Sequence, residues 1–337
     1  MINYYTRILR KLTFYKVYNF FKLAIGFHYS RWIKKPIQLG LPFFVSIEPT
    51  TSCNLRCPQC PSGLREFTRP TGMLQNRLFE KVISQLKKHL HSLTFYFQGE
   101  PYLNPDFLQM VSFANQQNIY TITSTNAHYL TPENAKQTVL SKLDKLIISV
   151  DGITQEVYEQ YRIGGHLDKV ISGTKEILKQ KKLLKSKTPH VVWQFVVFKP
   201  NEGQIQAVKE LGKELGVDQV KIKTAQIYDF EHGHHLIPEN ERYSRYKKNQ
   251  NGQFEIKNKL LDQCWRMWQG CVITWDGKVV PCCFDKDASH KLGNLETESF
   301  ETIWWSPPYT NFRRTVLGSR NQIDICTNCT EGTKVWS

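Results

Sequence analysis

Three cysteines, Cys53, Cys57 and Cys60, lie close together in the run Glu48-Pro-Thr-Thr-Ser-Cys-Asn-Leu-Arg-Cys-Pro-Gln-Cys. No fourth Cys or His lies nearby to complete the tetrahedral set that a structural zinc ion normally takes. Three thiolates suit a [4Fe-4S] cluster whose fourth iron has no protein ligand, since such clusters are usually held by Cys. An iron with an open coordination position can bind and activate a small molecule. The alternatives are a buried structural trio of cysteines and an incomplete zinc knuckle.

After Pro42, short β-rich runs alternate with helical patterns. The strands are expected at 43–47, 93–97, 120–124, 146–150, 191–198 and 219–223. The helices are expected at 74–90, 105–117, 132–142, 154–182 and 202–215, and Gly216 is a plausible C-cap of the last one. This alternation predicts an α/β fold with a parallel sheet. A partial (β/α)6 TIM-like barrel is the favoured architecture, and its site would lie at the C-terminal ends of the strands.

Each of the next three strands ends in residues suited to a site. Gln98-Gly-Glu-Pro101 follows the second strand, where Gly99 would let the backbone approach a ligand closely. Glu100 could accept a charge-assisted hydrogen bond from an ammonium group. Short polar side chains able to hold hydroxyls and a carboxylate follow the third and fourth strands: Ser124, Asn126, Ser149 and Asp151. Each of these four could instead cap a helix or a turn.

The triad and the strand ends together carry a family resemblance. The cysteine spacing resembles that of the radical S-adenosylmethionine (radical SAM) superfamily, and Gln98-Gly-Glu-Pro101 is similar to its Gly-Gly-Glu-Pro motif, with Gln98 in place of the first Gly. The resemblance implies that a reduced [4Fe-4S] cluster cleaves SAM to a 5′-deoxyadenosyl radical, which abstracts hydrogen from a substrate. It also implies that Glu100 binds the amino group of SAM, that the four polar residues contact its ribose and methionyl parts, and that flavodoxin or ferredoxin supplies the electron. Gln59 departs from the aromatic residue that many relatives have before the third cysteine.

Six of the nine cysteines lie from residue 264 onwards. Residues 272–280 read as a β-hairpin with a tight primed turn at Asp276-Gly277. This hairpin, Leu292-Gly-Asn294 and the closing Cys pair resemble the SPASM/Twitch extension of radical SAM enzymes. The resemblance implies one auxiliary [4Fe-4S] cluster, because no Cys lies between 283 and 326. Its expected ligands are Cys264, Cys282, Cys326 and Cys329. Cys271 or Cys283 could replace one of the first two, and a zinc ribbon on the same thiols is the alternative.

The expected domains are an N-terminal helical segment (1–38), the barrel (39–230), a polar connector (231–263) and the auxiliary domain (264–337). Asp285 could accept a proton once a substrate radical is oxidised, although a surface-loop carboxylate is the favoured interpretation. The histidines at 232, 234 and 235 are interpreted as linker residues. Residues 151–165, including Arg162, resemble a segment of SPASM-type relatives, but the sequence gives no role for that arginine.

The N-terminal segment is unusual in charge and in aromatic content. Residues 1–47 contain eight Lys and Arg residues and no Asp or Glu, and so supply +8 of the net charge of +15. A basic, aromatic, amphipathic helix within residues 1–35 could lie on an anionic membrane surface. Docking on the barrel is the favoured interpretation, because aromatic stripes are more often core. Nucleic-acid binding is not supported by any recognition motif.

The remaining composition predicts a cytoplasmic enzyme. The sequence has no apolar run of about 20 residues and no visible signal peptide, and its odd number of cysteines argues against a disulfide framework. The substrate stays open between a peptide, a small molecule and a lipid-linked intermediate. The alternative function is a non-catalytic iron–sulfur or zinc protein that binds an anionic partner.

Overall fold

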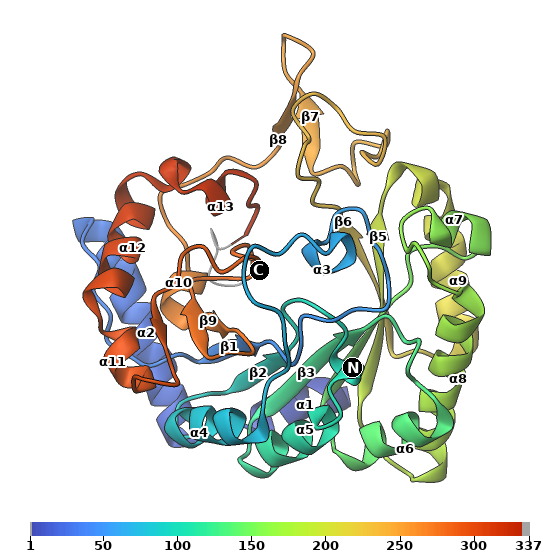
Figure 1. Ribbon diagram of the computed structural model, residues 1–337, viewed down its shortest axis with the longest axis horizontal. Coiled ribbons are helices and arrows are strands. Elements are labelled where there is room, and N and C mark those ends of the chain that lie inside the picture. The colour runs from blue at the N-terminus through green and yellow to red at the C-terminus, as the bar shows by residue number, and fades with distance from the viewer. Residues whose placement is uncertain (1, 332–337) are drawn as a thin grey trace.

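The computed structural model describes residues 2–331, and a parallel sheet lies at its centre (Figure 1). Six strands stand side by side in sequence order: Phe44–Ile47 (β1), Ser92–Phe95 (β2), Tyr120–Thr125 (β3), Lys145–Ser149 (β4), His190–Val197 (β5) and Gln219–Thr224 (β6). The outer helices are Asn76–Leu86 (α4), Phe107–Gln116 (α5), Pro132–Leu140 (α6), Gln155–Glu159 (α7), Leu167–Leu183 (α8) and Ile205–Leu215 (α9). The predicted α/β fold, with a partial barrel, is confirmed.

Apolar side chains at helical spacing attach the outer helices to the sheet. In α4 the buried positions recur every three or four residues, at Leu78, Phe79, Val82, Ile83 and Leu86. The Phe79 ring centroid lies 5.6 Å from that of Phe95 on β2, and Phe95 meets the Phe107 ring of α5 edge-on at 5.7 Å. The core therefore lies between the sheet and the helices, and the strand ends are left for the site.

Two of the predicted helices have different limits. A single helix at 154–182 was wrong, because α7 ends at Glu159 and α8 begins at Leu167. Between them the chain turns at Gly164, whose φ of +78° lies in the left-handed region. The helix expected at 202–215 begins as a 3₁₀ helix, Lys199–Gln204 (η2), and continues as α9. Gly216 is the C-cap of α9 with a φ of +83°, as predicted.

The cysteine-rich segment continues the barrel sheet. Gly270–Ile273 (β9) pairs in parallel with β1, and Lys278–Val280 (β10) and Gly293–Asn294 (β11) follow as antiparallel strands. The result is one nine-stranded sheet in the order β11-β10-β9-β1-β2-β3-β4-β5-β6. The predicted boundary at residue 264 therefore separates two sequence regions that share a sheet.

The turn between β9 and β10 differs from the predicted primed turn. Only Gly277, with a φ of +80°, is left-handed there, whereas a type I′ turn needs two such residues. The Gly277 amide donates to the Thr274 carbonyl at 3.0 Å, and the Thr274 amide donates to the Lys278 carbonyl at 2.9 Å. This pattern is a three-residue hairpin loop closed by a left-handed glycine, so the prediction of a primed turn was wrong.

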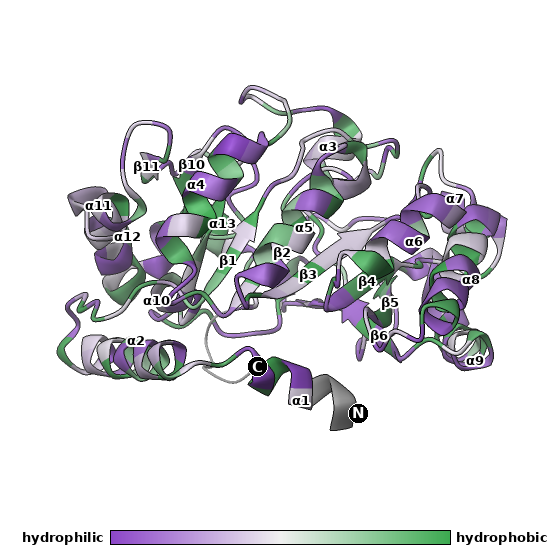
Figure 2. Ribbon diagram, turned by 90° about the horizontal axis from the view of Figure 1, so that it is seen from below, coloured by the Kyte–Doolittle hydropathy of each residue, from purple (hydrophilic) through white to green (hydrophobic). Residues whose placement is uncertain are grey.

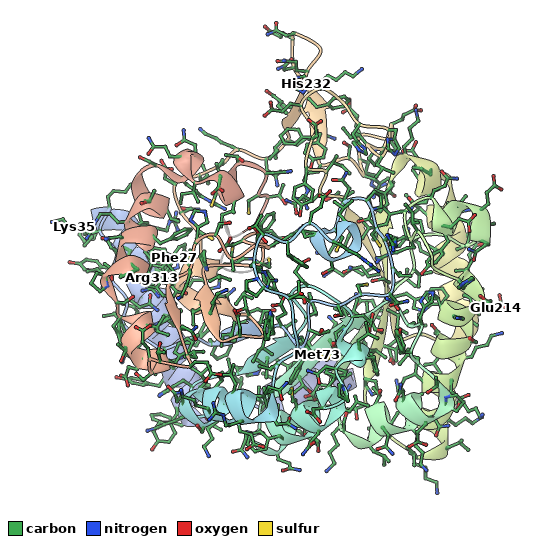
Figure 3. All side chains as sticks on the ribbon, viewed as in Figure 1. Phe27, Lys35, Met73, Glu214, His232 and Arg313 are labelled. Carbon is green, nitrogen blue, oxygen red and sulfur yellow. The ribbon has the colours of Figure 1, made fainter. Side chains whose placement is uncertain are left out.

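Short helices cover the cysteine-rich side. They are Arg266–Gln269 (α10), Phe300–Trp304 (α11), Pro307–Gly318 (α12), Arg320–Gln322 (η3) and Asp324–Thr327 (α13). Arg313 of α12 is buried among them and donates to the carbonyls of Met267 and Trp304, both at 3.1 Å (Figure 3). Its guanidinium lies 4.0 Å from the Tyr309 ring centroid, so one buried cation joins α10, α11 and α12.

The expected polar connector carries a small sheet of its own. Tyr246–Lys248 (β7) and Phe254–Ile256 (β8) pair antiparallel and project from the molecule, and His232 lies in this projection (Figures 1 and 3). Tyr246 is buried, and its hydroxyl accepts from the Ile227 amide at 2.8 Å. The connector is therefore attached to the barrel by packing as well as by the chain.

Two N-terminal helices, Ile2–Arg10 (α1) and Phe14–Ile33 (α2), lie on the side of the molecule opposite Pro61–Leu64 (α3) (Figure 2). The favoured prediction, a helix docked on the body, is confirmed by the buried side chains of α2. No helix within residues 2–331 is both long and apolar enough to cross a membrane.

Candidate functional site

The three cysteines of the triad line one cavity of about 280 Å³ at the end of the sheet. They occupy the loop between β1 and α3, and Cys57 is buried while Cys53 and Cys60 are half-buried. Burial, with smaller contributions from Glu100 and from the thiols of Cys57 and Cys60, raises the pKa of the Cys53 thiol to about 12. Three thiols thus converge on one cavity, where a bound cation such as iron would favour the thiolate form that ligates metals.

A buried ion pair fixes the loop that carries the triad. Glu48 directly follows β1, and both its carboxylate oxygens accept from Arg69, at 2.6 and 2.8 Å. The two side chains are only 0% and 4% exposed. The Trp275 amide also donates to Glu48 at 3.2 Å, which joins the β9–β10 hairpin to the start of the loop. The pair therefore holds three segments that are distant in the sequence.

Gly99 and Glu100 occupy the neighbouring strand end. A Cβ at Gly99 would lie 2.2 Å from the Thr50 carbonyl oxygen, and its φ is +73°, so this position requires glycine. The Glu100 carboxylate accepts from the Thr125 hydroxyl at 2.7 Å and from the Asn126 amide at 2.8 Å. Burial raises the pKa of Glu100 to about 7. A cation in the cavity would favour its ionised form.

The other predicted strand-end residues divide into two groups. Ser124, Asn126 and Ser149 line the same cavity as the triad. Asp151 does not line it: one carboxylate oxygen accepts from the Val196 amide at 2.8 Å, and the other from Arg162 Nε at 2.6 Å. Asp151 therefore holds Arg162 and does not face the cavity itself.

Arg162 is a site residue to which sequence reasoning assigned no role. It lines the cavity, and its Nη1 lies 3.7 Å from Cys57 Sγ. Asp151 engages its Nε and Nη2, so Nη1 faces the cavity with hydrogen-bonding capacity left. The sequence signal that could have identified this arginine is the run Tyr-Arg-Ile-Gly-Gly at residues 161–165. The turn at its two glycines brings the guanidinium back to the end of the strand.

The later cysteines form a second group. Burial, and to a smaller extent the nearby Cys264 thiol, raises the pKa of Cys282, Cys326 and Cys329, so Cys264 lies near all three. Arg320 of η3 donates to Cys329 Sγ at 3.4 Å, a contact that the sequence did not indicate. These are the four auxiliary ligands expected from the sequence.

The two alternative ligands are not separated from this set, because Cys271 and Cys283 line one cavity of about 80 Å³ together with Cys282. Cys271 is buried in β9, where its charged neighbour is Arg313. Cys283 is exposed and faces Arg266, Glu331 and Lys286. The preferred ligand set therefore stays a prediction, as does the replacement of one of its first two members by Cys271 or Cys283.

Asp285 is buried, whereas the favoured interpretation placed it on the surface. Its two carboxylate oxygens accept from the amides of Ser289 at 2.8 Å and His290 at 3.0 Å. These bonds stabilise the turn after the Cys282-Cys283 pair. Both oxygens have backbone partners, so Asp285 remains only a prediction as a proton acceptor.

A second cavity of about 550 Å³ adjoins the first, and Gln59 and Lys286 line both. Its other lining residues include Tyr228, Asp285 and His234. His234 lies 3.4 Å from Gln59, so one of the histidines interpreted as linker reaches the site. A space of about 280 Å³ at the triad therefore lies beside a larger one of about 550 Å³.

The side chains fit the expected cofactors in kind and position. Within residues 2–331 no three His, Cys, Asp or Glu side chains are gathered closely enough to hold a single metal ion. The fit of a cluster rests on three free thiols around one cavity, together with Glu100 and Arg162 in its wall. These two carry the opposite charges that would complement the amino and carboxyl groups of an amino acid.

Two family models match the chain. The radical SAM superfamily matches residues 47–186, and SPASM, an iron–sulfur cluster-binding domain, matches residues 264–330. A curated relative, the tungsten-containing aldehyde ferredoxin oxidoreductase cofactor-modifying protein of Pyrococcus furiosus, is 25% identical over 314 residues. That match covers 85% of this chain and 86% of the relative.

Solved structures share the fold at low identity. BtrN in complex with AdoMet and 2-DOIA has a TM-score of 0.53 at 18% identity, covering 86% of this chain and 94% of BtrN. SuiB of Streptococcus suis, bound to precursor peptide SuiA, has a TM-score of 0.62 at 15% identity and covers 82% of this chain and 67% of SuiB. One neighbour is thus described with a small molecule and the other with a peptide.

Proposed function

This chain belongs to the radical SAM superfamily and carries a SPASM domain, and we propose that it abstracts hydrogen from a substrate held in the 550 Å³ cavity. When bound, SAM at the open iron of the cluster supplies a 5′-deoxyadenosyl radical after one-electron reduction. Cys53, Cys57 and Cys60 would hold the cluster. The single observation that carries the proposal is the convergence of these thiols with Glu100 and Arg162 on one cavity.

The chain's own residues would orient the methionyl part of SAM. Glu100 would accept from the ammonium group, because its carboxylate lies in the cavity wall. Within residues 2–331 its hydrogen-bond donors are uncharged, namely the Thr125 hydroxyl and the backbone amides of Asn126 and Tyr102. Arg162 would donate to the carboxylate through Nη1. Ser124, Asn126 and Ser149 offer hydroxyl and amide groups for the ribose.

The substrate would approach through the cavity that shares Gln59 and Lys286 with the cofactor space. Lys286 lies on the segment after Cys283, and its ammonium contacts the Tyr228 hydroxyl. An ammonium at the junction of the two cavities favours a substrate with an anionic or strongly polar group. A cavity of this size suits a small molecule or one side chain of a peptide. The four later cysteines would hold one auxiliary cluster beside it.

The direct test is release of 5′-deoxyadenosine by anaerobically reconstituted, chemically reduced protein given SAM. We expect equal amounts of 5′-deoxyadenosine and methionine, and about eight iron atoms per chain from two cubes. Zinc in place of iron in the purified protein, with no cleavage of SAM, would instead support the non-catalytic metalloprotein.

The substitution Arg162→Gln should raise the KM for SAM by roughly 10- to 100-fold, because a charge-assisted hydrogen bond contributes about 1.5–3 kcal/mol. Arg162→Lys should fall in between, since it keeps the charge and loses the planar fork. Initial rates of SAM cleavage across SAM concentrations separate KM from kcat. Arg242→Gln, which changes an exposed arginine, is the control. An unchanged KM in Arg162→Gln would remove Arg162 from the SAM site.

A further inference from the structure

The helix α2 has two apolar faces, and the inner one is fixed to the body of the protein. Phe27 packs edge-on against Trp265 and Trp268, with ring centroids 5.3 and 5.4 Å away. Asn19 donates to the Leu41 carbonyl at 2.7 Å and accepts from the Leu41 amide at 2.9 Å. Lys16 is buried and donates to the Asn118 carbonyl at 2.6 Å. These contacts hold α2 in one orientation.

The outer face of α2 is apolar and exposed. Phe14 and Trp32, at opposite ends, are 79% and 80% exposed. The exposed residues recur at spacings of three or four, which places them along one stripe of the helix. This outer stripe consists of Phe14, Tyr18, Phe21, Ile25, Tyr29 and Trp32. A helix that is apolar on both sides is normally covered on both, and within the described residues nothing covers this side.

Positive charge surrounds the outer stripe. Lys22 lies 5.7 Å from the Tyr18 ring centroid, and Lys88, at the end of α4, lies 4.4 Å from that of Tyr15 at the edge of the stripe. Lys34 and Lys35 follow the C-terminal end of α2 and are exposed, and Lys35 lies at the edge of the molecule (Figure 3). Residues 1–47 contain no carboxylate side chain. Glu301 of α11 acts on His89 together with Lys88 and Lys22, and so offsets part of this charge.

We propose that the outer stripe of α2 binds the surface of an anionic lipid bilayer. Aromatic and aliphatic side chains would enter the boundary between headgroups and acyl chains, and the lysines would contact anionic headgroups. Trp and Tyr, which favour that boundary, make up half of the stripe. A symmetric contact with a second copy would place the same basic surface against itself. Nucleic acid would leave the aliphatic side chain of Ile25 without a stacking partner.

The position of the stripe decides how such binding would serve the enzyme. Figure 2 shows α1 and α2 along one side of the molecule and α3, which follows the cysteine triad, on the opposite side. The cavity at the strand ends would therefore face away from the bilayer. Binding would tether the enzyme at the surface and leave its opening towards water, so a substrate embedded in the same bilayer is disfavoured.

Because α2 is part of the folded body, the test uses substitutions on its outer face and keeps the helix. The full chain is floated with vesicles of phosphatidylcholine and phosphatidylserine, and with vesicles of phosphatidylcholine alone. We expect binding to the anionic vesicles, reduced by added salt, and at least about a tenfold weaker partition for the triple variant Phe21→Gln, Ile25→Gln and Trp32→Gln. Trp305→Gln, which alters an exposed tryptophan at the end of α11, should bind like the unmodified protein.

Thermal unfolding and SAM cleavage verify that each variant is folded, and both should be unchanged in the triple variant because its side chains are exposed. Equal vesicle binding by the triple variant would overturn the proposal. Failure of the unmodified protein to bind anionic vesicles would do the same, as would a dimer in light scattering that the triple variant abolishes. Binding to single-stranded nucleic acid in place of vesicles would also overturn it. Vesicle binding is measured without SAM, so it does not depend on the proposed reaction.

Discussion

The substitution Cys57→Ala should abolish release of 5′-deoxyadenosine and lower the iron content from about eight to about four atoms per chain. Cys57 is the buried member of the triad, and its thiol lines the cavity beside Arg162. The auxiliary cysteines form a separate group, so their cluster should survive. Iron analysis and quantitation of 5′-deoxyadenosine, both under anaerobic conditions, measure the two effects.

The matched control is Cys271→Ala, since Cys271 is also buried and lies near Arg313, but it is not among the preferred ligands of either cluster. It should keep about eight iron atoms and full cleavage of SAM. Loss of four iron atoms in this variant would contradict the auxiliary ligand set. Retention of all iron in Cys57→Ala would contradict the assignment of the triad.

The substitution Glu48→Gln should lower the free energy of unfolding by about 3–5 kcal/mol, because it leaves the buried guanidinium of Arg69 without its counter-charge. The loss arises from the uncompensated charge and from the weakened bidentate hydrogen bonds, which hold the loop of the triad. Chemical denaturation, followed by tryptophan fluorescence, measures the change.

An exposed pair provides the comparison for this substitution. Lys199 and Glu239 approach to 2.6 Å, but their side chains are 50% and 71% exposed. Glu239→Gln should therefore lower the free energy of unfolding far less than Glu48→Gln does, because solvent screens an exposed pair. Equal losses in the two variants would show that burial does not set the contribution of the Glu48–Arg69 pair.

The fold was predictable where its cause is local. Alternation of β-rich runs and amphipathic helices located all six barrel strands, and Gly216 ended α9 as expected. The split of the helix at 154–182 depends on Gly164 and on Arg162 turning back to Asp151, a tertiary contact. Pairing of β9 with β1 joins residues more than 200 positions apart, and no local pattern encodes such a choice.

The site was predictable where motif spacing carries the chemistry. The triad, Gly99 and Glu100 line one cavity as expected, and so do Ser124, Asn126 and Ser149. Asp151 was assigned to a ligand, but its carboxylate is engaged by Arg162 and the Val196 amide. Lys286 was missed because only folding brings the segment after Cys283 against the loop that carries Gln59.

The pairing of β9 with β1 also bears on attempts to dissect the protein. Residues 44–47 form hydrogen bonds with β2 on one side and with β9 on the other. Removal of the chain from Cys264 onwards would leave β1, a mostly buried and apolar strand, as an unpaired edge of the sheet. Exposed strand edges of this kind can pair with other chains and cause aggregation. The opposite border, β6, is better suited to stand free, because it carries Lys221 and Lys223. The iron–sulfur segment thus also shields the barrel from aggregation, and an excised barrel would need a substitute strand.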